Sequence, residues 1–349
     1  MNQSWMSAPI PAPSIRRMEG ARLRQEQLTK PRGSLGRLEE LAIRLAGLQD
    51  REFPSVDRVR VVVFAGDHGV TAAGISAYPQ SVTVEMIRNF SSGGAAISVL
   101  ARNLGATLEV VDVGTIRDPG PLPGVVSCRA GAGTQDFRTQ PAMTTESLRI
   151  AFRAGAEAAK RAVASGCDLF IGGEMGIGNS TSAAALASAL THKAPSLLAG
   201  PGTGLNAKGV ARKVEVIEEA LDHHQHSLNT PVEALLSLGG FEIAALIGAF
   251  IVSAQHRVPI LVDGYIVSVA ALVATRLRAD LAPWLLFSHE SAEPGHRVVL
   301  EALNGSALLD LGLRLGEASG SAVALPLLRL ACTLHREMAT FAEAGISEG

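Results

Sequence analysis

Short runs of apolar and β-branched residues alternate along the chain with longer alanine-rich segments that have a helical pattern. The runs show no polar alternation, which is typical of strands covered on both faces in a parallel sheet. In the segment 144–165, a threonine can cap the helix, Glu146 lies in the first turn, and Gly166 ends it. We therefore predict a doubly wound α/β fold with a mostly parallel, Rossmann-like sheet. The predicted strands are 59–65, 108–113, 167–172, 196–200, 259–264 and 284–289.

The two ends of the chain differ from this pattern. Residues 14–50 and 305–345 are predicted to be helical without strands, and the first segment carries many charges. We expect the two ends to pack together as a second, smaller helical domain. The predicted domains are a large α/β domain of residues 55–304 and a small domain of residues 1–54 plus 305–349.

Composition narrows the class of protein. Of 349 residues, 47% are apolar and only 18% are charged, so we expect a buried subunit interface and a homodimer. The net charge of −2 argues against nucleic-acid binding. The longest central apolar run, 243–254, is too short to span a bilayer, and the N-terminus lacks the features of a secretory signal. Three scattered cysteines fit a reducing compartment, so we expect a cytoplasmic protein without membrane association.

Candidate chemistry collects where the predicted strands end. Ligands of open parallel sheets bind at the carboxyl ends of the strands. Nearly every predicted strand runs there into small, polar or charged residues, which predicts a site along this edge. These ends are "AGDHG" (65–69), "DVG" (112–114), "GGEMGIGNST" (172–181), "GPGTG" (200–204), "DGY" (263–265) and "SHESAEPGH" (288–296).

Two of these ends are glycine loops that precede helices. Free backbone N–H groups at a helix N-terminus favour an anion such as phosphate, and Lys213 could add a positive charge. The alternative is that both loops are only tight turns. No lysine follows Gly178 as in a P-loop, and Thr181 occupies the third glycine position of a dinucleotide fingerprint. No adjacent acids follow a strand, as a Mg-pyrophosphate donor would need, so a mononucleotide phosphate fits best.

The acids and histidines allow several interpretations. Glu174 lies inside the first glycine loop, where a carboxylate suits a cation or ribose hydroxyls better than an anion. Spacing alone makes Glu317 an acid that complements a helix dipole. The histidines of "DHHQH" (222–226) lie in a polar stretch, which favours a solvated face over a metal site. We predict no metal and no cofactor.

Taken in order, the motifs resemble those of the nicotinate-nucleotide–dimethylbenzimidazole phosphoribosyltransferase family of cobalamin nucleotide-loop assembly. The resemblance implies transfer of 5-phosphoribose from nicotinate mononucleotide to 5,6-dimethylbenzimidazole, giving α-ribazole 5′-phosphate and nicotinate. It covers nearly the whole chain. The matching segments include "KPRGSLGRLE", "FAGDHGV", "GISAYPQSVT", "SSGGAAISVLAR", "GGEMGIGNSTSAAAL", "GPGTGL", "LGGFEIAALIGA", "ILVDGYIVS", "SAEPGH" and "LGLRLGEASGSAVALPLL".

The resemblance also implies roles for individual residues. Glu317 becomes the general base, in place of a dipole acid, and Glu174 stabilises positive charge on the ribose or holds the ribose. The nucleotide-binding candidates are Gly176, Gly178, Asn179, Ser180, Gly202, Thr203, Gly204, Lys213, Asp263 and Ser291, and the acceptor candidates are Tyr78, Gln80, Met86 and Leu315.

The chain departs from the family pattern at Pro201, Ala318 and Glu290, none of which is a proposed catalytic group. The resemblance leaves open whether the acceptor is a benzimidazole, a purine or a phenol. Two other functions compete with the transferase. A nucleotide or azole sensor would keep the glycine loops without needing Glu317, and a nucleoside phosphorylase-type enzyme would need free phosphate as nucleophile.

Overall fold

The structure, a computed structural model, describes residues 4–347. Within them, six strands form one parallel sheet in the order β3-β2-β1-β4-β5-β6, and β7 pairs with β8. The strand order reverses between β1 and β4, the position at which open α/β sheets bind ligands. The predicted α/β class with a mostly parallel sheet is confirmed. The strands are β1 (Val59–Gly66), β2 (Thr107–Gly114), β3 (Val125–Ser127), β4 (Leu169–Met175), β5 (Ile260–Val262), β6 (Leu285–Phe287), β7 (His289–Glu290) and β8 (Leu309–Asp310).

Five of the six predicted strands coincide with strands of the sheet, and the prediction for 196–200 is wrong. That segment forms a short helix, α7 (Pro195–Leu198), followed by a loop. Proline at the first helical position favours a helix start, and the run is too short for periodicity to separate the two states. Strand β3 was not predicted, because it is a three-residue strand at the sheet edge whose side chains are not fully buried. The prediction that 305–345 contains no strand is also wrong, because β8, too short to leave a pattern in the sequence, lies there.

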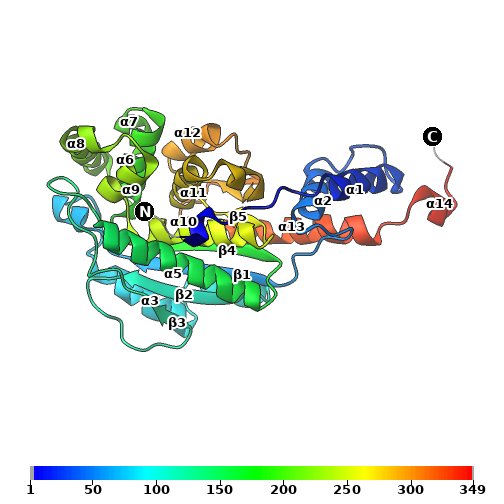
Figure 1. The fold of residues 1–349 in the computed structure, drawn as a ribbon, viewed down its shortest axis with the longest axis horizontal. Coiled ribbons are helices and arrows are strands. Elements are labelled where there is room, and N and C mark those ends of the chain that lie inside the picture. Colours follow the sequence, from blue (N-terminus) through cyan, green and yellow to red (C-terminus); the bar gives the residue numbers. More distant parts are fainter. Residues whose placement is uncertain (1–3, 348–349) are drawn as a thin grey trace.

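One face of the sheet carries a thick layer of helices (Figure 1) that share a single hydrophobic core with it. The apolar run 243–254 lies inside α10, where it is buried on all sides. Among the described residues, no helix combines the length and apolar character that crossing a membrane requires. The helices of this layer are α5 (Thr145–Ala164), α6 (Asn179–Thr191), α7, α8 (Ala207–His223), α9 (Pro231–Leu238), α10 (Phe241–Gln255), α11 (Tyr265–Leu277) and α12 (Gly295–Ala302).

The opposite face is covered by α3 (Ser81–Ser92), α4 (Ala96–Asn103) and the first half of α13 (Ser319–Glu337). Leu325 and Leu328 of α13 are fully buried in the same core as Val61 and Ile171 of the sheet. Helix α13 therefore starts at the carboxyl edge of the sheet, and its position fixes the residues just before it.

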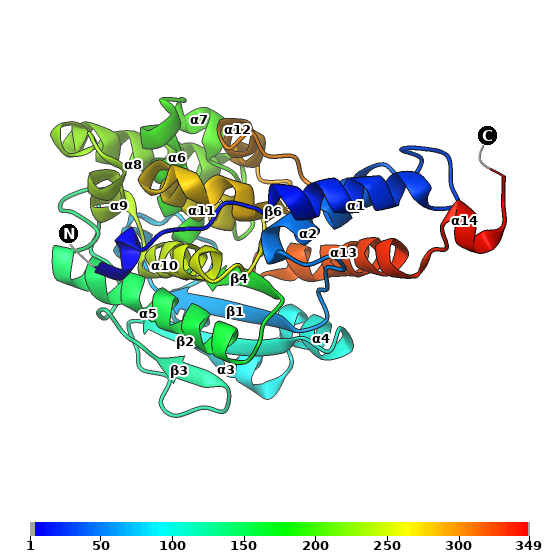
Figure 2. The same ribbon diagram turned by 45° about the vertical axis from the view of Figure 1, so that its right-hand side comes forward.

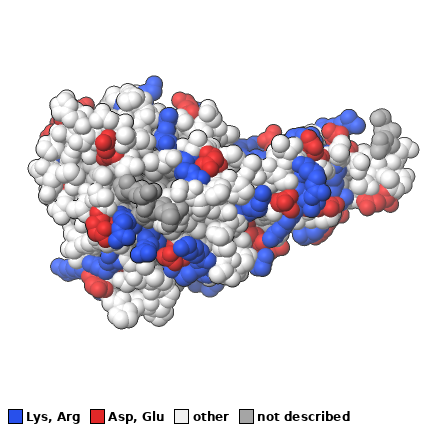
Figure 3. All heavy atoms as spheres, viewed as in Figure 1, with Lys and Arg blue, Asp and Glu red and all other residues white. Residues whose placement is uncertain are grey.

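The second half of α13 leaves the body and packs beside α1 (Ile15–Gln27) and α2 (Arg37–Gln49), with α14 (Phe341–Ala344) at the tip (Figures 1 and 2). Arg24 Nε donates to the carbonyl of His335 at 2.7 Å, so the two ends of the chain do meet. Positive and negative side chains are interspersed on this projection (Figure 3). Because α13 also belongs to the core under the sheet, the division into two domains at 54 and 305 stays a prediction.

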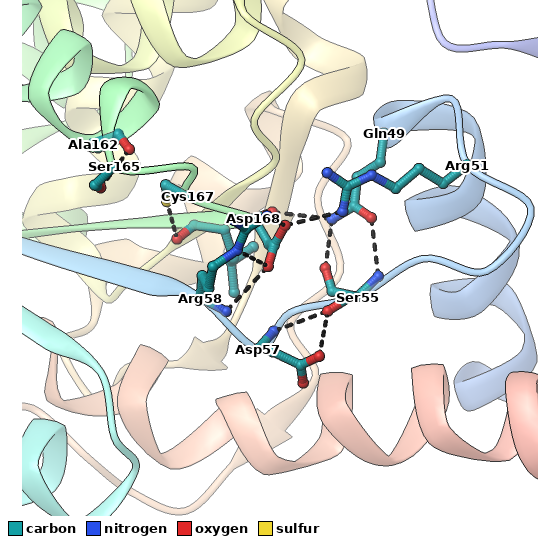
Figure 4. A network of polar contacts seen from close by, with 10 residues as sticks. Gln49, Arg51, Ser55, Asp57, Arg58, Ala162, Ser165, Cys167 and Asp168 are labelled. Carbon is teal, nitrogen blue, oxygen red and sulfur yellow. Dashed lines mark hydrogen bonds and ion pairs between the residues drawn. The ribbon is translucent and has the colours of Figure 1, made fainter.

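The opposite edge of the sheet is tied to the segment that follows α2 (Figure 4). The buried carboxylate of Asp168 accepts hydrogen bonds from the Arg58 side chain and backbone, at 3.1–3.2 Å, and from Arg51 at 3.0 Å. Gln49 Nε2 donates to the Asp168 carbonyl at 3.0 Å. These contacts hold the starts of β1 and β4 in register. The remaining described helices are 3₁₀ turns at Ser4–Ser7, Gly69–Ala73, Gln225–Ser227 and Ala279–Trp284.

The close packing of α5 on α10 depends on glycine, which gives a prediction. A methyl group at Gly155 would overlap the carbonyl oxygen of Ala245. We expect Gly155→Ala to lower the free energy of unfolding by about 1–3 kcal/mol through overpacking. Gly20, in α1, has open space around its Cβ position, so Gly20→Ala should raise stability by about 0.5–1 kcal/mol. Urea denaturation of both variants measures this, and equal effects would contradict it.

Candidate active site

Three buried acids meet at the carboxyl edge of the sheet. Glu174 lies on β4, Asp263 follows β5, and Glu317 precedes α13, and each is less than a tenth exposed. The carboxyls of Asp263 and Glu317 lie close enough to that of Glu174 for their charges to raise its pKa. The structure therefore brings together both predicted catalytic acids and one predicted nucleotide-binding acid.

The turn that carries Glu317 lies directly on β4. Gly316, Glu317 and Ala318 have φ angles of +85°, +62° and +69°. This left-handed conformation costs side-chain-bearing residues on the order of 1 kcal/mol each. A side chain at Gly173 would come within 2.8 Å of Ala318, and one at Gly316 would overlap the Glu174 carboxylate. Two glycines thus let the turn place Glu317 beside Glu174.

The hydrogen bonds of these acids leave oxygen atoms free. Asn179 Nδ2 donates to Glu174 Oε2, and the Ser321 backbone donates to Asp263 Oδ1 at 2.7 Å. In the described part of the chain, Asp263 Oδ2 and Glu317 Oε2 are buried without a hydrogen-bond partner. Such atoms are costly in a folded protein and are free to receive a donor group of a ligand.

The protonation of the cluster follows from its burial. Burial, with the nearby Glu242 charge next in importance, raises the pKa of Glu174 to about 8. Burial and the Asp263 charge raise the pKa of Glu317 to about 7, and burial also raises the pKa of Asp263. Near neutral pH Glu174 and Glu317 are therefore only partly ionised, and a cationic ligand would favour the charged forms of the cluster.

A buried lysine joins the two glycine loops. Lys213 Nζ, on α8, donates to the Gly200 carbonyl at 2.9 Å and to Ser180 Oγ at 3.2 Å. Burial lowers its pKa to about 8. Gly202 has a φ of +51°, and a side chain there would come within 2.7 Å of Ser180 Oγ and 3.0 Å of Lys213 Nζ. This positive charge beside two backbone turns suits an anion.

The peptide groups of Gly202 are held on both sides by residues for which no role was predicted. Its N–H donates to Glu293 Oε1 at 3.0 Å, and its carbonyl accepts from Arg314 Nη1 at 3.0 Å. Glu293 Oε2 is buried without a partner among the described residues. Glu293 belongs to the quoted "SAEPGH" motif, but nothing in the sequence indicates its contact with the second glycine loop.

The other loop residues are largely engaged by protein groups. Thr203 Oγ1 accepts from the Ala77 backbone at 3.1 Å, and Ser291 Oγ accepts from the Glu293 backbone at 3.3 Å. A side chain at Gly176 would overlap the carbonyl of Gly66, so packing alone requires glycine there. Gly178 and Gly204 both have positive φ, at +99° and +106°. The glycines therefore serve tight turns whether or not an anion binds.

The predicted acceptor residues are all at least partly open to solvent. Tyr78 is 55% exposed and Leu315 is 58% exposed, while Gln80 and Met86 are half-buried. Gln80 Nε2 donates to the His68 carbonyl at 2.6 Å. Because Leu315 is two residues before Glu317, an apolar side chain lies open to solvent next to the buried acids. A flat apolar ligand could cover it.

Beneath the first glycine loop lies a second buried pair. His68 Nε2 is 2.7 Å from Glu242 Oε1, at the start of α10, and both side chains are fully buried. A side chain at Gly178 would come within 3.1 Å of His68 Cβ, so this pair supports the loop from below. The sequence indicates His68 as a residue of the edge, but its partner is 174 residues away and has no recognisable spacing.

The "DHHQH" segment differs from its predicted solvated face at one position. His224 is buried, and its Nε2 lies 2.8 Å from the Phe137 carbonyl. It faces the interior because the end of α8 packs against that loop. In residues 4–347, no three His, Cys, Asp or Glu side chains are arranged to hold a metal ion.

Comparisons with known proteins agree with this architecture. A family model described as phosphoribosyltransferase matches residues 10–346, which defines the class of the protein. The chain belongs to the family of nicotinate-nucleotide–dimethylbenzimidazole phosphoribosyltransferases, and the family predicted from the sequence motifs is confirmed.

The relatives match over their full length. The proteins of that name from Pseudomonas fluorescens and Ectopseudomonas mendocina are 59% and 58% identical to this chain, with 100% of it and 99% of each relative covered. The crystal structure of CobT from Thermus thermophilus is 44% identical, with a TM-score of 0.92, and the match covers 96% of this chain and 100% of that one.

The raised pKa of Glu174 predicts a stability that depends on pH. A carboxyl whose folded pKa of about 8 exceeds its unfolded value near 4.5 destabilises the fold as pH rises between those values. At pH 8.5 we expect Glu174→Gln to have a higher free energy of unfolding than wild type, by a few kcal/mol at most, and so to unfold at a higher urea concentration. At pH 4.5 the two proteins should differ little. A pH-independent difference between the two proteins would contradict the raised pKa.

Proposed function

We propose that the protein transfers 5-phosphoribose from nicotinate mononucleotide to 5,6-dimethylbenzimidazole, giving α-ribazole 5′-phosphate and nicotinate, in the lower-ligand branch of cobalamin biosynthesis. The relatives carry the name of this reaction. The observation that best supports the proposal is the pairing of a buried cationic loop at Lys213 with a separate cluster of partly unpaired acids.

This pairing matches the charges of the donor. Nicotinate mononucleotide carries an anionic phosphate and a pyridinium ring whose nitrogen, at the reacting bond, is cationic and which also bears a carboxylate. In the proposed complex, the phosphate binds near Lys213 and the ribose lies toward Glu174 and Asp263. The raised pKa values of the acids support this arrangement, because like carboxyls buried together favour a ligand that brings positive charge.

The chemistry requires one bond exchange and one proton transfer. The glycosidic C–N bond breaks, and its electron pair neutralises the pyridinium nitrogen, which leaves as nicotinate. The acceptor's unprotonated ring nitrogen forms the new C–N bond from the opposite face, and its other nitrogen then loses a proton to Glu317. Glu174 stabilises the positive charge that develops on the ribose carbon.

The remaining assignments follow the same arrangement. The acceptor base binds beside the exposed side chains of Tyr78 and Leu315 and the half-buried side chains of Gln80 and Met86. The nucleotide side comprises Gly176, Gly178, Asn179, Ser180, Gly202, Thr203, Gly204, Lys213, Asp263 and Ser291.

We also infer that the protein is a homodimer and acts in the cytoplasm. The low charged fraction, 18%, supports a subunit interface, since so little of the surface is available as charge. Sedimentation velocity tests the dimer. A single species at the monomer mass would contradict it.

The role of Glu317 gives a prediction with a pH readout. A base with a pKa of about 7 must be ionised, so kcat/KM should fall about tenfold for each pH unit below 7. Glu317→Gln should lower kcat by about 10²–10⁴-fold and lose the part of the acid limb that belongs to a pKa near 7, while the ionisation of Glu174, whose pKa is about 8, still affects both proteins. The assay combines nicotinate mononucleotide with 5,6-dimethylbenzimidazole and detects α-ribazole 5′-phosphate by chromatography with mass detection.

Glu301→Gln, an exposed acid on α12, is the matched control and should keep the wild-type profile. Near-normal turnover by Glu317→Gln would reject Glu317 as the base. Nucleotide binding without product from wild type, with any azole acceptor, would instead favour a sensor.

A further inference from the structure

The strained turn that carries Glu317 is held from two directions. On the side of α13, the Asp263 carboxylate accepts from the Ser321 backbone. On the other side, the chain before the turn is fastened by two hydrogen bonds. The Ala292 backbone donates to the Leu313 carbonyl at 2.9 Å, and Arg314 donates to the Gly202 carbonyl at 3.0 Å.

The second of these bonds ends in the anion loop. Ser180 Oγ and Lys213 Nζ lie directly beside Gly202, in the space where a side chain would be. The Gly202 N–H is also bound by Glu293, whose neighbour Ala292 bonds to the segment of Arg314. A change at the Gly202 peptide therefore reaches the chain segment before Glu317 through two routes.

The chemistry of Arg314 suits a link between two sites. Its guanidinium has five N–H donors, so it can keep the Gly202 carbonyl and also bind a phosphate oxygen. Its charge acts on Glu293, the carboxylate that occupies the Gly202 N–H here. A phosphate that enters beside Lys213 would compete with Glu293 for that N–H and would attract Arg314.

Arg314 and Glu317 are close together in the chain, so the segment that links the Gly202 loop to the acid cluster is short. Arg314 is three residues before Glu317, and three residues span at most roughly 11 Å. The guanidinium thus lies at the anion loop and the carboxylate at the acid cluster, at the two ends of one short segment. Because the turn is strained, the contacts at its two ends add to its packing on β4 in keeping Glu317 in place.

We propose that Arg314 is a positioning residue that couples phosphate in the Gly202 loop to the placement of Glu317. The donor's phosphate then contributes to the rate as well as to binding, because it fixes the segment that carries the base. This inference rests on the proposed transferase function.

The test separates the phosphate from the rest of the donor. Nicotinate riboside, which lacks the phosphate, is assayed with 5,6-dimethylbenzimidazole in the presence and absence of inorganic phosphite. We expect phosphite to raise kcat/KM for the riboside in wild type by about 5- to 150-fold, the usual range of coupling between two sites. In Arg314→Met the activation that remains at saturating phosphite should be largely lost, so that weaker binding of phosphite alone does not account for the result.

Controls distinguish positioning from damage. Arg297→Met removes an arginine whose side chain is 75% exposed, and it should keep the full activation. Arg314→Lys retains the charge but not the planar fork, and should recover only part of the activation. Thermal melting of each variant shows whether it is folded. If Arg314→Met does not fold, the activation measured with Arg314→Lys tests the proposal.

Several results would overturn the proposal. Equal activation by phosphite in wild type and Arg314→Met would show that Arg314 does not couple phosphate binding to the placement of Glu317. The proposal would also be wrong if Arg314→Met raised the KM for nicotinate mononucleotide and left kcat unchanged, because Arg314 would then only contact the phosphate. Absence of product from wild type with the complete donor would reject the proposed function itself, a result that is distinct from either.

Discussion

The contact between the Glu317 turn and strand β4 is the constraint on which the rest of the site depends. The backbone of Ala318 lies where a side chain at Gly173 would be, and the Glu174 carboxylate fills the space beside Gly316. A larger residue at either glycine would push the turn away from the sheet and separate the two acids. Because α13 is anchored in the core under the sheet, the sheet provides a rigid reference against which the strained turn is fixed. The geometry of the acid cluster is therefore a consequence of packing at two positions that have no side chain.

This arrangement costs stability. Buried carboxyls with raised pKa values oppose folding when they ionise, and the left-handed turn adds strain. The two hydrophobic cores offset this cost, since both faces of the parallel sheet are covered and α5 approaches α10 backbone to backbone at Gly155. The low charged fraction of the chain is consistent with so much of it being buried.

The sequence predicted what depends on local pattern and missed what depends on distant contacts. Continuous apolar runs located five of the six strands of the sheet, but the run 196–200 contains too few residues to distinguish a strand from the helix that Pro195 begins. The residues after each strand located the edge that holds the acids. Spacing assigned Glu317 to the helix dipole, and only the resemblance gave it a chemical role. Glu293 and Arg314 could not be found, because their common partner, Gly202, comes from a segment about 90 to 110 residues away.

Lys213 lies away from the cluster of Glu174, Asp263 and Glu317, and the proposed reaction gives a reason for this separation. In the proposed reaction, one unit of positive charge faces Glu174, Asp263 and Glu317 at every stage. It begins on the pyridinium ring, passes to the ribose carbon as the bond breaks, and then to the acceptor ring as the new bond forms. It ends as the proton on Glu317. The phosphate keeps its negative charge throughout, next to Lys213, at the other end of the donor. If Lys213 lay among the acids, it would neutralise them and remove the preference for a cation, so its fixed bonds to Gly200 and Ser180 serve selectivity as much as binding.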